Sequence, residues 1–127
     1  MRVLLVEDDE LLRALTSRIL RSLGHDVVEA SSARTALEQL TGPDTSVDVL
    51  FSDIKLGGST DGVELARQAI EIVPSLRVLL TSGDPSTFRA GVLPADRMRL
   101  LPKPYRKDQI RESLEALALP APPPWPR

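Results

Sequence analysis

A short apolar run that ends in a carboxylate, at residues 47–53, constrains the fold of this chain more than any other stretch. The run reads VDVLFSD. Four apolar side chains in so short a run, bounded by polar turn signals, predict a strand buried in a parallel sheet. Asp53 then stands at the carboxyl end of that strand, where open α/β sheets bind ligands. The sequence therefore predicts a polar site on one edge of a sheet.

A second apolar run, at residues 3–6, leads into Glu7, Asp8 and Asp9. If the two strands are parallel neighbours, their acidic ends meet, and crowded carboxylates repel one another and favour proton uptake. A hard cation removes that penalty, and Mg²⁺ is the common choice for an oxygen-only site that keeps waters. Asp9 either touches the water shell of such a metal or only caps the helix that follows.

Strand and helix patterns alternate along the rest of the chain. Strands are expected at 2–7, 26–30, 47–52, 77–82 and 98–101, and helices at 9–23, between Ser31 or Ser32 and Gly42, between Asp61 and Pro74, and at 106–118. Residues 86–97 are the least clear, because the glycine and proline there leave room for about two helical turns. The alternation predicts an α/β fold with a parallel sheet covered by helices on both faces. Within the first helix, Leu11, Leu15 and Ile19 form a stripe that we expect in the core.

Composition excludes several classes of protein. The 127 residues favour one domain with a real core. The absence of cysteine excludes disulfides, and a single histidine excludes a His-rich metal site. A net charge of −2 gives no footprint for nucleic acid or an acidic membrane, and no apolar run approaches a membrane span. Because the chain enters a strand directly after Met1, without a signal-peptide pattern, we expect a natural N-terminus and a cytoplasmic protein.

Polar residues lie at the ends of four of the predicted strands and meet at one edge of the sheet. Glu7 and Ser82 are the last residues of their predicted strands, and Asp8, Asp53 and Lys103 come directly or shortly after theirs. Such a set suits phosphoryl transfer, because a metal neutralises phosphate oxygens, a lysine pairs with another oxygen and a hydroxyl donates to a third. A carboxylate acceptor would form an acyl phosphate, which is labile enough for a signal.

The motifs at these strand ends resemble the receiver domain of two-component response regulators, and are similar to receivers associated with hybrid histidine kinases. They read VEDD at 6–9, FSDI at 51–54, LTSG at 80–83 and LPKPY at 101–105. The resemblance covers residues 2–118. It implies a flavodoxin-like, doubly wound sheet of five parallel strands in the order 2-1-3-4-5, built as (βα)5. It also implies a receiver domain over 1–119, followed by a proline-rich tail at 120–127.

The resemblance assigns a metal site and an acceptor to numbered residues. Asp53 matches the phosphoacceptor. Asp8 matches the direct Mg²⁺ ligand, and Glu7 its water-mediated companion. Asp53 itself and the backbone carbonyl of Lys55 complete the protein's share of the coordination.

Two further matches and two departures concern the residues that would respond to phosphorylation. Ser82 matches the hydroxyl that swings toward the phosphoryl group, and Lys103 the lysine that pairs with it; the peptide bond after this lysine is cis in many family members. Gly57 stands where the family often has proline, so a flexible loop is expected there. Leu100 stands where a switch aromatic often lies, which puts the usual coupling of hydroxyl and aromatic movement in doubt.

The implied function is that of a single-domain response regulator. It accepts a phosphoryl group from a sensor histidine kinase or a phosphotransfer protein, and catalyses only its own phosphoryl transfer and autodephosphorylation. Because no output domain follows residue 118, we expect the signal to pass through contacts with a downstream protein target. No nucleic-acid or membrane partner is expected, and the sequence leaves open whether the chain forms a homodimer.

Three other functions share parts of this pattern. A pseudo-receiver would use the same fold as a binding module without phosphorylation. A phosphatase with an aspartyl-phosphate intermediate needs a second acid two residues after its nucleophile, where this chain has Lys55. A flavodoxin-type cofactor binder would meet repulsion between the FMN phosphate and the acids at 7–9. Lys55 and Asp84 flank the pocket with opposite charges, and we hypothesise that they pair over it and restrict water.

Overall fold

The computed structural model describes residues 1–42, 46–57, 60–84 and 93–118, and within these ranges it contains one parallel sheet of five strands. The strands lie side by side in the order β2-β1-β3-β4-β5, which confirms the predicted order. Their bounds are β1 Arg2–Val6, β2 Asp26–Ala30, β3 Val49–Asp53, β4 Arg77–Ser82 and β5 Met98–Pro102. β3 begins two residues later than predicted and includes Asp53 as its last residue.

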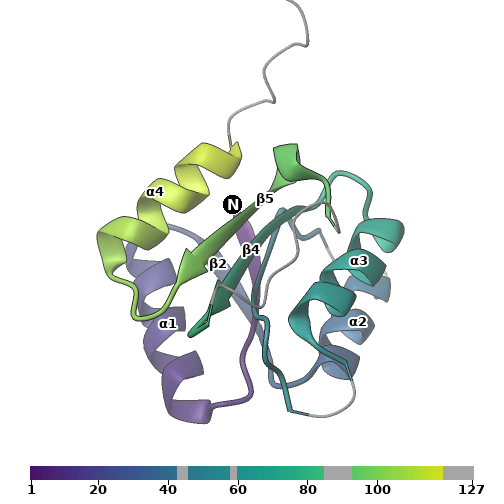
Figure 1. The fold of residues 1–127 in the computed structure, drawn as a ribbon, viewed down its shortest axis with the longest axis horizontal. Coiled ribbons are helices and arrows are strands. Elements are labelled where there is room, and N and C mark those ends of the chain that lie inside the picture. Colours follow the sequence, from purple (N-terminus) through teal and green to yellow (C-terminus); the bar gives the residue numbers. More distant parts are fainter. Residues whose placement is uncertain (43–45, 58–59, 85–92, 119–127) are drawn as a thin grey trace, which may run out of the picture.

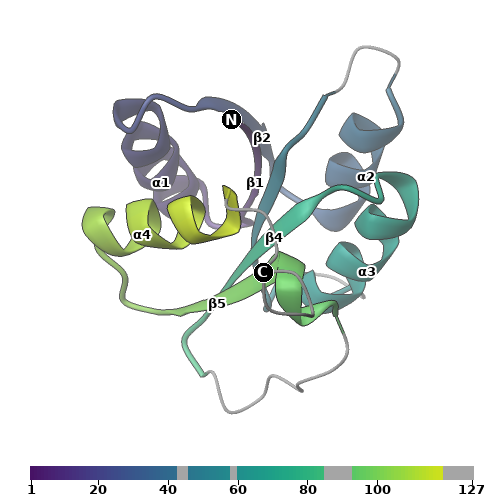
Figure 2. The same cartoon turned by 90° about the horizontal axis from the view of Figure 1, so that it is seen from above.

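Helices cover both faces of this sheet. They are α1 Glu10–Ser22, α2 Ala33–Thr41, α3 Gly62–Ile72 and α4 Lys107–Ala118. Figures 1 and 2 show α1 and α4 on one face and α2 and α3 on the other. The predicted helix within 86–97 falls mostly outside the described residues, and only a 3-10 turn at Ala95–Arg97 is described there.

Side-chain caps begin three of the helices. Asp9, Ser32 and Asp61 each accept a hydrogen bond from the backbone N–H three residues later. Such bonds satisfy donors that have no partner inside the helix. Two of the capping residues, Asp9 and Asp61, are acids that directly precede α1 and α3, and their caps mark where these helices begin. No helix in the described ranges is long and apolar enough to cross a bilayer.

Alternate residues of the central strands pack into two separate hydrophobic cores, one on each face of the sheet. On β1, Leu4 and Val6 pack with α2 and α3, whereas Val3 and Leu5 pack with α1 and α4. All four side chains are almost completely buried. Burial on both faces explains why this strand reads as an unbroken apolar run instead of an alternating one.

The face that α1 buries matches only part of the predicted apolar stripe. Leu11 and Leu15 are 71% and 48% exposed, so the prediction that they belong to the core was wrong. Ile19 packs against the core as predicted, next to the buried Leu20, and Thr16 is buried although its polar side chain gave no such signal. The Thr16 hydroxyl can be buried because it lies 2.9 Å from the Tyr105 hydroxyl, and a buried polar group with a partner is tolerated.

The strand register brings the carboxyl ends of four strands together. Val6 of β1 pairs with Ser52 of β3, and Asp53 pairs with Thr81 of β4. Ser82 in turn pairs with Pro102 of β5. The residues that directly follow these ends therefore meet at one edge of the sheet.

Candidate functional site

A pocket of about 570 Å³ opens at this edge of the sheet. Asp53, Ser82 and Lys103 line it together with Lys55 and Asp84. Three of the residues predicted from separate strand ends thus share one cavity. Glu7 and Asp8 do not line this pocket, but Glu7 contacts Lys103 beside it.

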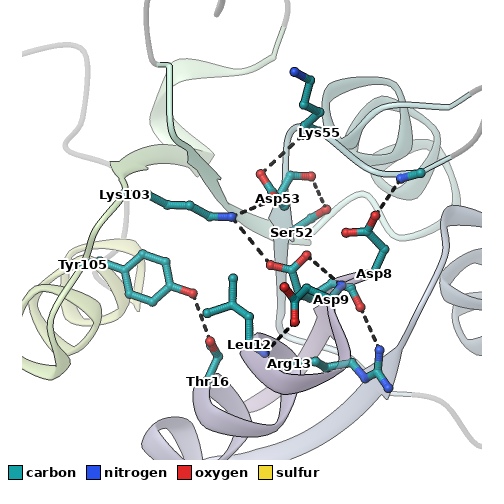
Figure 3. Close-up of polar contacts among 12 residues, drawn as sticks. Asp8, Asp9, Leu12, Arg13, Thr16, Ser52, Asp53, Lys55, Lys103 and Tyr105 are labelled. Atoms are coloured by element: carbon teal, nitrogen blue, oxygen red, sulfur yellow. Dashed lines mark hydrogen bonds and ion pairs between the residues drawn. The ribbon is translucent and has the colours of Figure 1, made fainter.

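Lys103 joins the carboxylates of two strands. Its Nζ lies 2.7 Å from Asp53 Oδ2 (Figure 3), and it also lies 3.6 Å from Glu7 Oε1. Burial disfavours the charged amine, but the hydrogen bond to Asp53 and the negative charges of Asp53 and Glu7 outweigh it, so the pKa of Lys103 is raised. Its backbone N–H donates to the Ser82 carbonyl at 2.8 Å, and the Lys103–Pro104 bond is cis. The ammonium group therefore stays charged and offsets the acids around it.

The β1–α1 loop presents two acids that crowd each other. Glu7 is buried, and burial together with its contact with Asp8 raises the pKa of Glu7. Arg13 Nη1 donates to the Glu7 carbonyl oxygen at 2.9 Å. Asp8 Oδ2 accepts the backbone N–H of Gly57 at 3.1 Å. The loop is thus held from α1 on one side and from the β3–α3 loop on the other.

Asp9 acts as a helix cap in this structure. Its Oδ1 accepts the Leu12 N–H at 3.0 Å, as Figure 3 shows. Of the two roles that the sequence left open, capping is the one that carries a contact here.

The donor set at this edge fits a hard cation by its chemistry. Within the described ranges, no group of three acidic or histidine side chains is already arranged around one point that could hold an ion. The contacts give the reason: Lys103 lies against both Asp53 and Glu7, and Asp8 is engaged by Gly57. The acids nevertheless offer only oxygen ligands, which suit a hard cation.

Ser82, and not the adjacent Thr81, lines the pocket. Ser82 Oγ accepts the Asp84 N–H at 3.0 Å. Thr81 is buried inside the sheet, and its carbonyl oxygen accepts the Ile54 N–H at 2.9 Å. Strand alternation thus separates two neighbouring hydroxyls that the sequence distinguishes only weakly.

Lys55 contacts the predicted acceptor through its backbone. Its N–H donates to Asp53 Oδ1 at 3.3 Å. Lys55 and Asp84 both line the pocket, and their pairing over it stays a prediction.

Two glycines support the site in ways that sequence reasoning missed. Gly57 supplies the N–H that holds Asp8, a bond that proline at this position could not make. Gly62 packs so tightly on the end of β3 that an added Cβ would lie 2.9 Å from the Asp53 carbonyl carbon. A single glycine after a helix cap carries no sequence signal for such an approach, because the opposing backbone comes from another element.

The family model for the response regulator receiver domain matches residues 3–115. The chain belongs to the response regulator receiver family. It is a receiver domain of two-component systems, a signalling module whose role depends on phosphorylation. Receiver domains as a family hold Mg²⁺ at the phosphorylation site and interact with histidine kinases or phosphotransfer proteins.

The chain is similar both to a receiver protein of about its own length and to parts of longer proteins. It is 30% identical over 125 residues to the response regulator receiver protein CpdR of Brucella abortus (strain 2308). This alignment covers 94% of this chain and 98% of CpdR. It is 34% identical over 116 residues to the sensor kinase CckA of the same strain, 91% of this chain but only 12% of the kinase. The crystal structure of the receiver domain from the hybrid histidine kinase CckA superimposes with a TM-score of 0.75 at 29% identity, over 92% of this chain and 99% of that one.

Proposed function

We propose that Asp53 accepts a phosphoryl group from a phosphohistidine on a sensor histidine kinase or a phosphotransfer protein. The observation that supports this most directly is the 2.7 Å contact between Lys103 Nζ and Asp53 Oδ2, in a pocket that Ser82 also lines. A buried carboxylate held by a lysine and open to a cavity on one side is suited to nucleophilic attack on phosphorus. The reaction is therefore transfer to the protein itself.

The residues of the pocket divide the chemistry among them. A carboxylate oxygen of Asp53 attacks the phosphorus, the bond to the imidazole nitrogen breaks, and the leaving imidazole takes up a proton. The product is an acyl phosphate. Lys103 pairs with one phosphoryl oxygen, and the Ser82 hydroxyl donates to another. Ser82 can do so because its Oγ already accepts the Asp84 N–H and its own O–H remains a donor.

We further propose that Mg²⁺ binds beside Asp53. Asp8 would be a direct ligand and Glu7 a ligand through water, with Asp53 and the Lys55 carbonyl oxygen completing the protein's share. When bound, the ion neutralises charge on the phosphoryl oxygens. The oxygen-only donor set supports this assignment, and so does the position of Glu7 and Asp53, which both lie against the Lys103 ammonium group.

The downstream role of the protein is proposed only because the chain is a receiver domain. The phosphorylated domain signals through contacts with a downstream protein and loses the group by its own autodephosphorylation. The cytoplasmic location and the boundary between domain and tail near residue 119 stay predictions, and the tail at 120–127 lies outside the described residues.

Intact-mass measurement after incubation with acetyl phosphate tests the proposal. We expect the wild type to gain one phosphoryl group with Mg²⁺ and none with EDTA, and Asp53→Asn to gain none. Asp48→Asn is the matched control, because Asp48 precedes the same strand and its Oδ2 accepts the Arg2 N–H, far from the pocket. An adduct that survives in Asp53→Asn would place the acceptor elsewhere. A folded wild type without an adduct would favour a pseudo-receiver.

A further inference from the structure

Tyr105, the single tyrosine of the chain, follows Lys103 by two residues. Its hydroxyl lies 2.9 Å from the Thr16 hydroxyl in α1, a hydrogen bond between residues 89 positions apart (Figure 3). Burial raises the pKa of Tyr105, so the phenol stays neutral and keeps its proton near neutral pH. A hydrogen bond therefore connects the segment after Lys103 to α1.

The partner of this bond is deeply buried. Thr16 is 1% exposed and lies in the middle of α1. A buried hydroxyl that loses its partner is destabilised by more than a typical hydrogen bond contributes. Breaking the hydrogen bond between Thr16 and Tyr105 is therefore unfavourable for the folded protein.

The ring of Tyr105 packs against the strand of the proposed acceptor. It meets Phe51 edge to face, with ring centroids 6.0 Å apart and an interplanar angle of 64°. Phe51 is 1% exposed and precedes Asp53 by two residues in β3. One side chain thus contacts β3 through its ring and α1 through its hydroxyl.

These contacts restrain Lys103 on its C-terminal side. On its N-terminal side the chain is held by β5, and the Lys103 N–H donates to the Ser82 carbonyl. The side chain itself must reach Asp53 and Glu7 at the same time. A loop free to swing on one side would spread the position of Nζ over a wider range.

We propose that Tyr105 is a positioning residue whose hydrogen bond to Thr16 holds the Lys103 loop against α1, so that the Lys103 ammonium stays aimed at a phosphoryl group on Asp53. This inference rests on the proposed function, since it requires Asp53 to carry that group. The acids of the β1–α1 loop have their own restraints, namely the Gly57 N–H on Asp8 and Arg13 on the Glu7 carbonyl. Loss of the tyrosine hydroxyl should therefore disturb the lysine and leave the metal-binding acids in place.

The test uses the full chain with the substitutions Tyr105→Phe, Thr16→Val and both together. Thr16→Ser is the matched control, because it keeps the hydroxyl. Two dissociation constants are measured by calorimetry: that of Mg²⁺ alone, and that of beryllofluoride, a stable phosphoryl mimic, at saturating Mg²⁺. The rate of adduct formation from acetyl phosphate, at several donor concentrations, separates donor affinity from the transfer step.

We expect each single substitution to weaken beryllofluoride binding and slow transfer about fivefold, the factor that corresponds to one typical hydrogen bond. The double variant should also lose about fivefold, not about 25-fold, because both changes remove the same bond. Mg²⁺ affinity should stay within about twofold of the wild type, and Thr16→Ser should behave like the wild type.

Three results would overturn the inference. Unchanged beryllofluoride binding in Tyr105→Phe would show that the hydroxyl does not position Lys103. A parallel loss of Mg²⁺ affinity would indicate a general loosening of the fold, and multiplied effects in the double variant would separate Tyr105 from Thr16. If the wild type itself binds no beryllofluoride and gains no phosphoryl group, the proposed function falls, and the inference falls with it.

Discussion

Gly62→Ala is expected to destabilise the protein more than the addition of one methyl group suggests. Gly62 is the first residue of α3, and its N–H donates to the Ile54 carbonyl at 2.7 Å. An added Cβ would overlap the Asp53 carbonyl oxygen and lie 2.9 Å from the Asp53 carbonyl carbon and from Ile54 Cα. Because these atoms belong to backbone, no side chain can rotate away. Either α3 or the end of β3 must move.

The magnitude follows from two opposing effects. Overpacking a close contact costs about 1–3 kcal/mol, and a clash with backbone belongs at the upper end of that range. Alanine in a helix contributes roughly 0.5–1 kcal/mol relative to glycine. We therefore expect the free energy of unfolding to fall by about 2 kcal/mol.

Urea unfolding followed by circular dichroism measures this change. Gly83→Ala is the matched control, because an added Cβ there would meet no atom within 4 Å. Its free energy of unfolding should stay within about 0.5 kcal/mol of the wild type. The displaced end of β3 should also slow phosphorylation of Asp53 in Gly62→Ala. A Gly62→Ala protein as stable as the wild type would refute the close approach of α3 to β3.

Three further substitutions test the fold and the pocket. Asp61→Ala removes the side chain that accepts the Glu64 N–H at 2.8 Å, and it should lower the free energy of unfolding by about 1 kcal/mol. Asp61→Asn keeps an acceptor oxygen and should lose much less stability. Equal losses for the two variants in urea unfolding would show that this hydrogen bond does not stabilise the helix. Leu50→Ala, at a fully buried side chain of β3, should lose about 2–5 kcal/mol in the same assay, and a loss well under that range would mean that the core is looser than described. If Lys55 pairs with Asp84 over the pocket and restricts water, Lys55→Ala should speed decay of the phosphoryl adduct. The increase should be at most about fivefold, since an exposed ion pair contributes no more than about 1 kcal/mol. A decay rate equal to that of the wild type would contradict this pairing.

Much of the fold could be predicted because its signals are local. Val49, Leu50 and Phe51 are three consecutive apolar residues, and only a strand covered on both faces buries all of them. Strands alternating with helical patterns then lead to a parallel sheet. In such a sheet all strands point the same way, so Asp53, Ser82 and Lys103 had to gather at one edge. The sequence by itself therefore determined that the sheet is parallel and that Asp53, Ser82 and Lys103 meet at one edge of it.

Tertiary structure alone decided which faces and contacts complete the site. Leucine spacing favoured Leu11 and Leu15 as core, yet α1 buries Thr16, because a hydroxyl can go inside when a partner from a distant element meets it. That partner, Tyr105, lies 89 residues away, and no local pattern links the two. The tight approach of Gly62 to β3 is hidden for the same reason. Periodicity records how apolar a face is, whereas hydrogen bonds and close backbone contacts depend on where other elements come to lie.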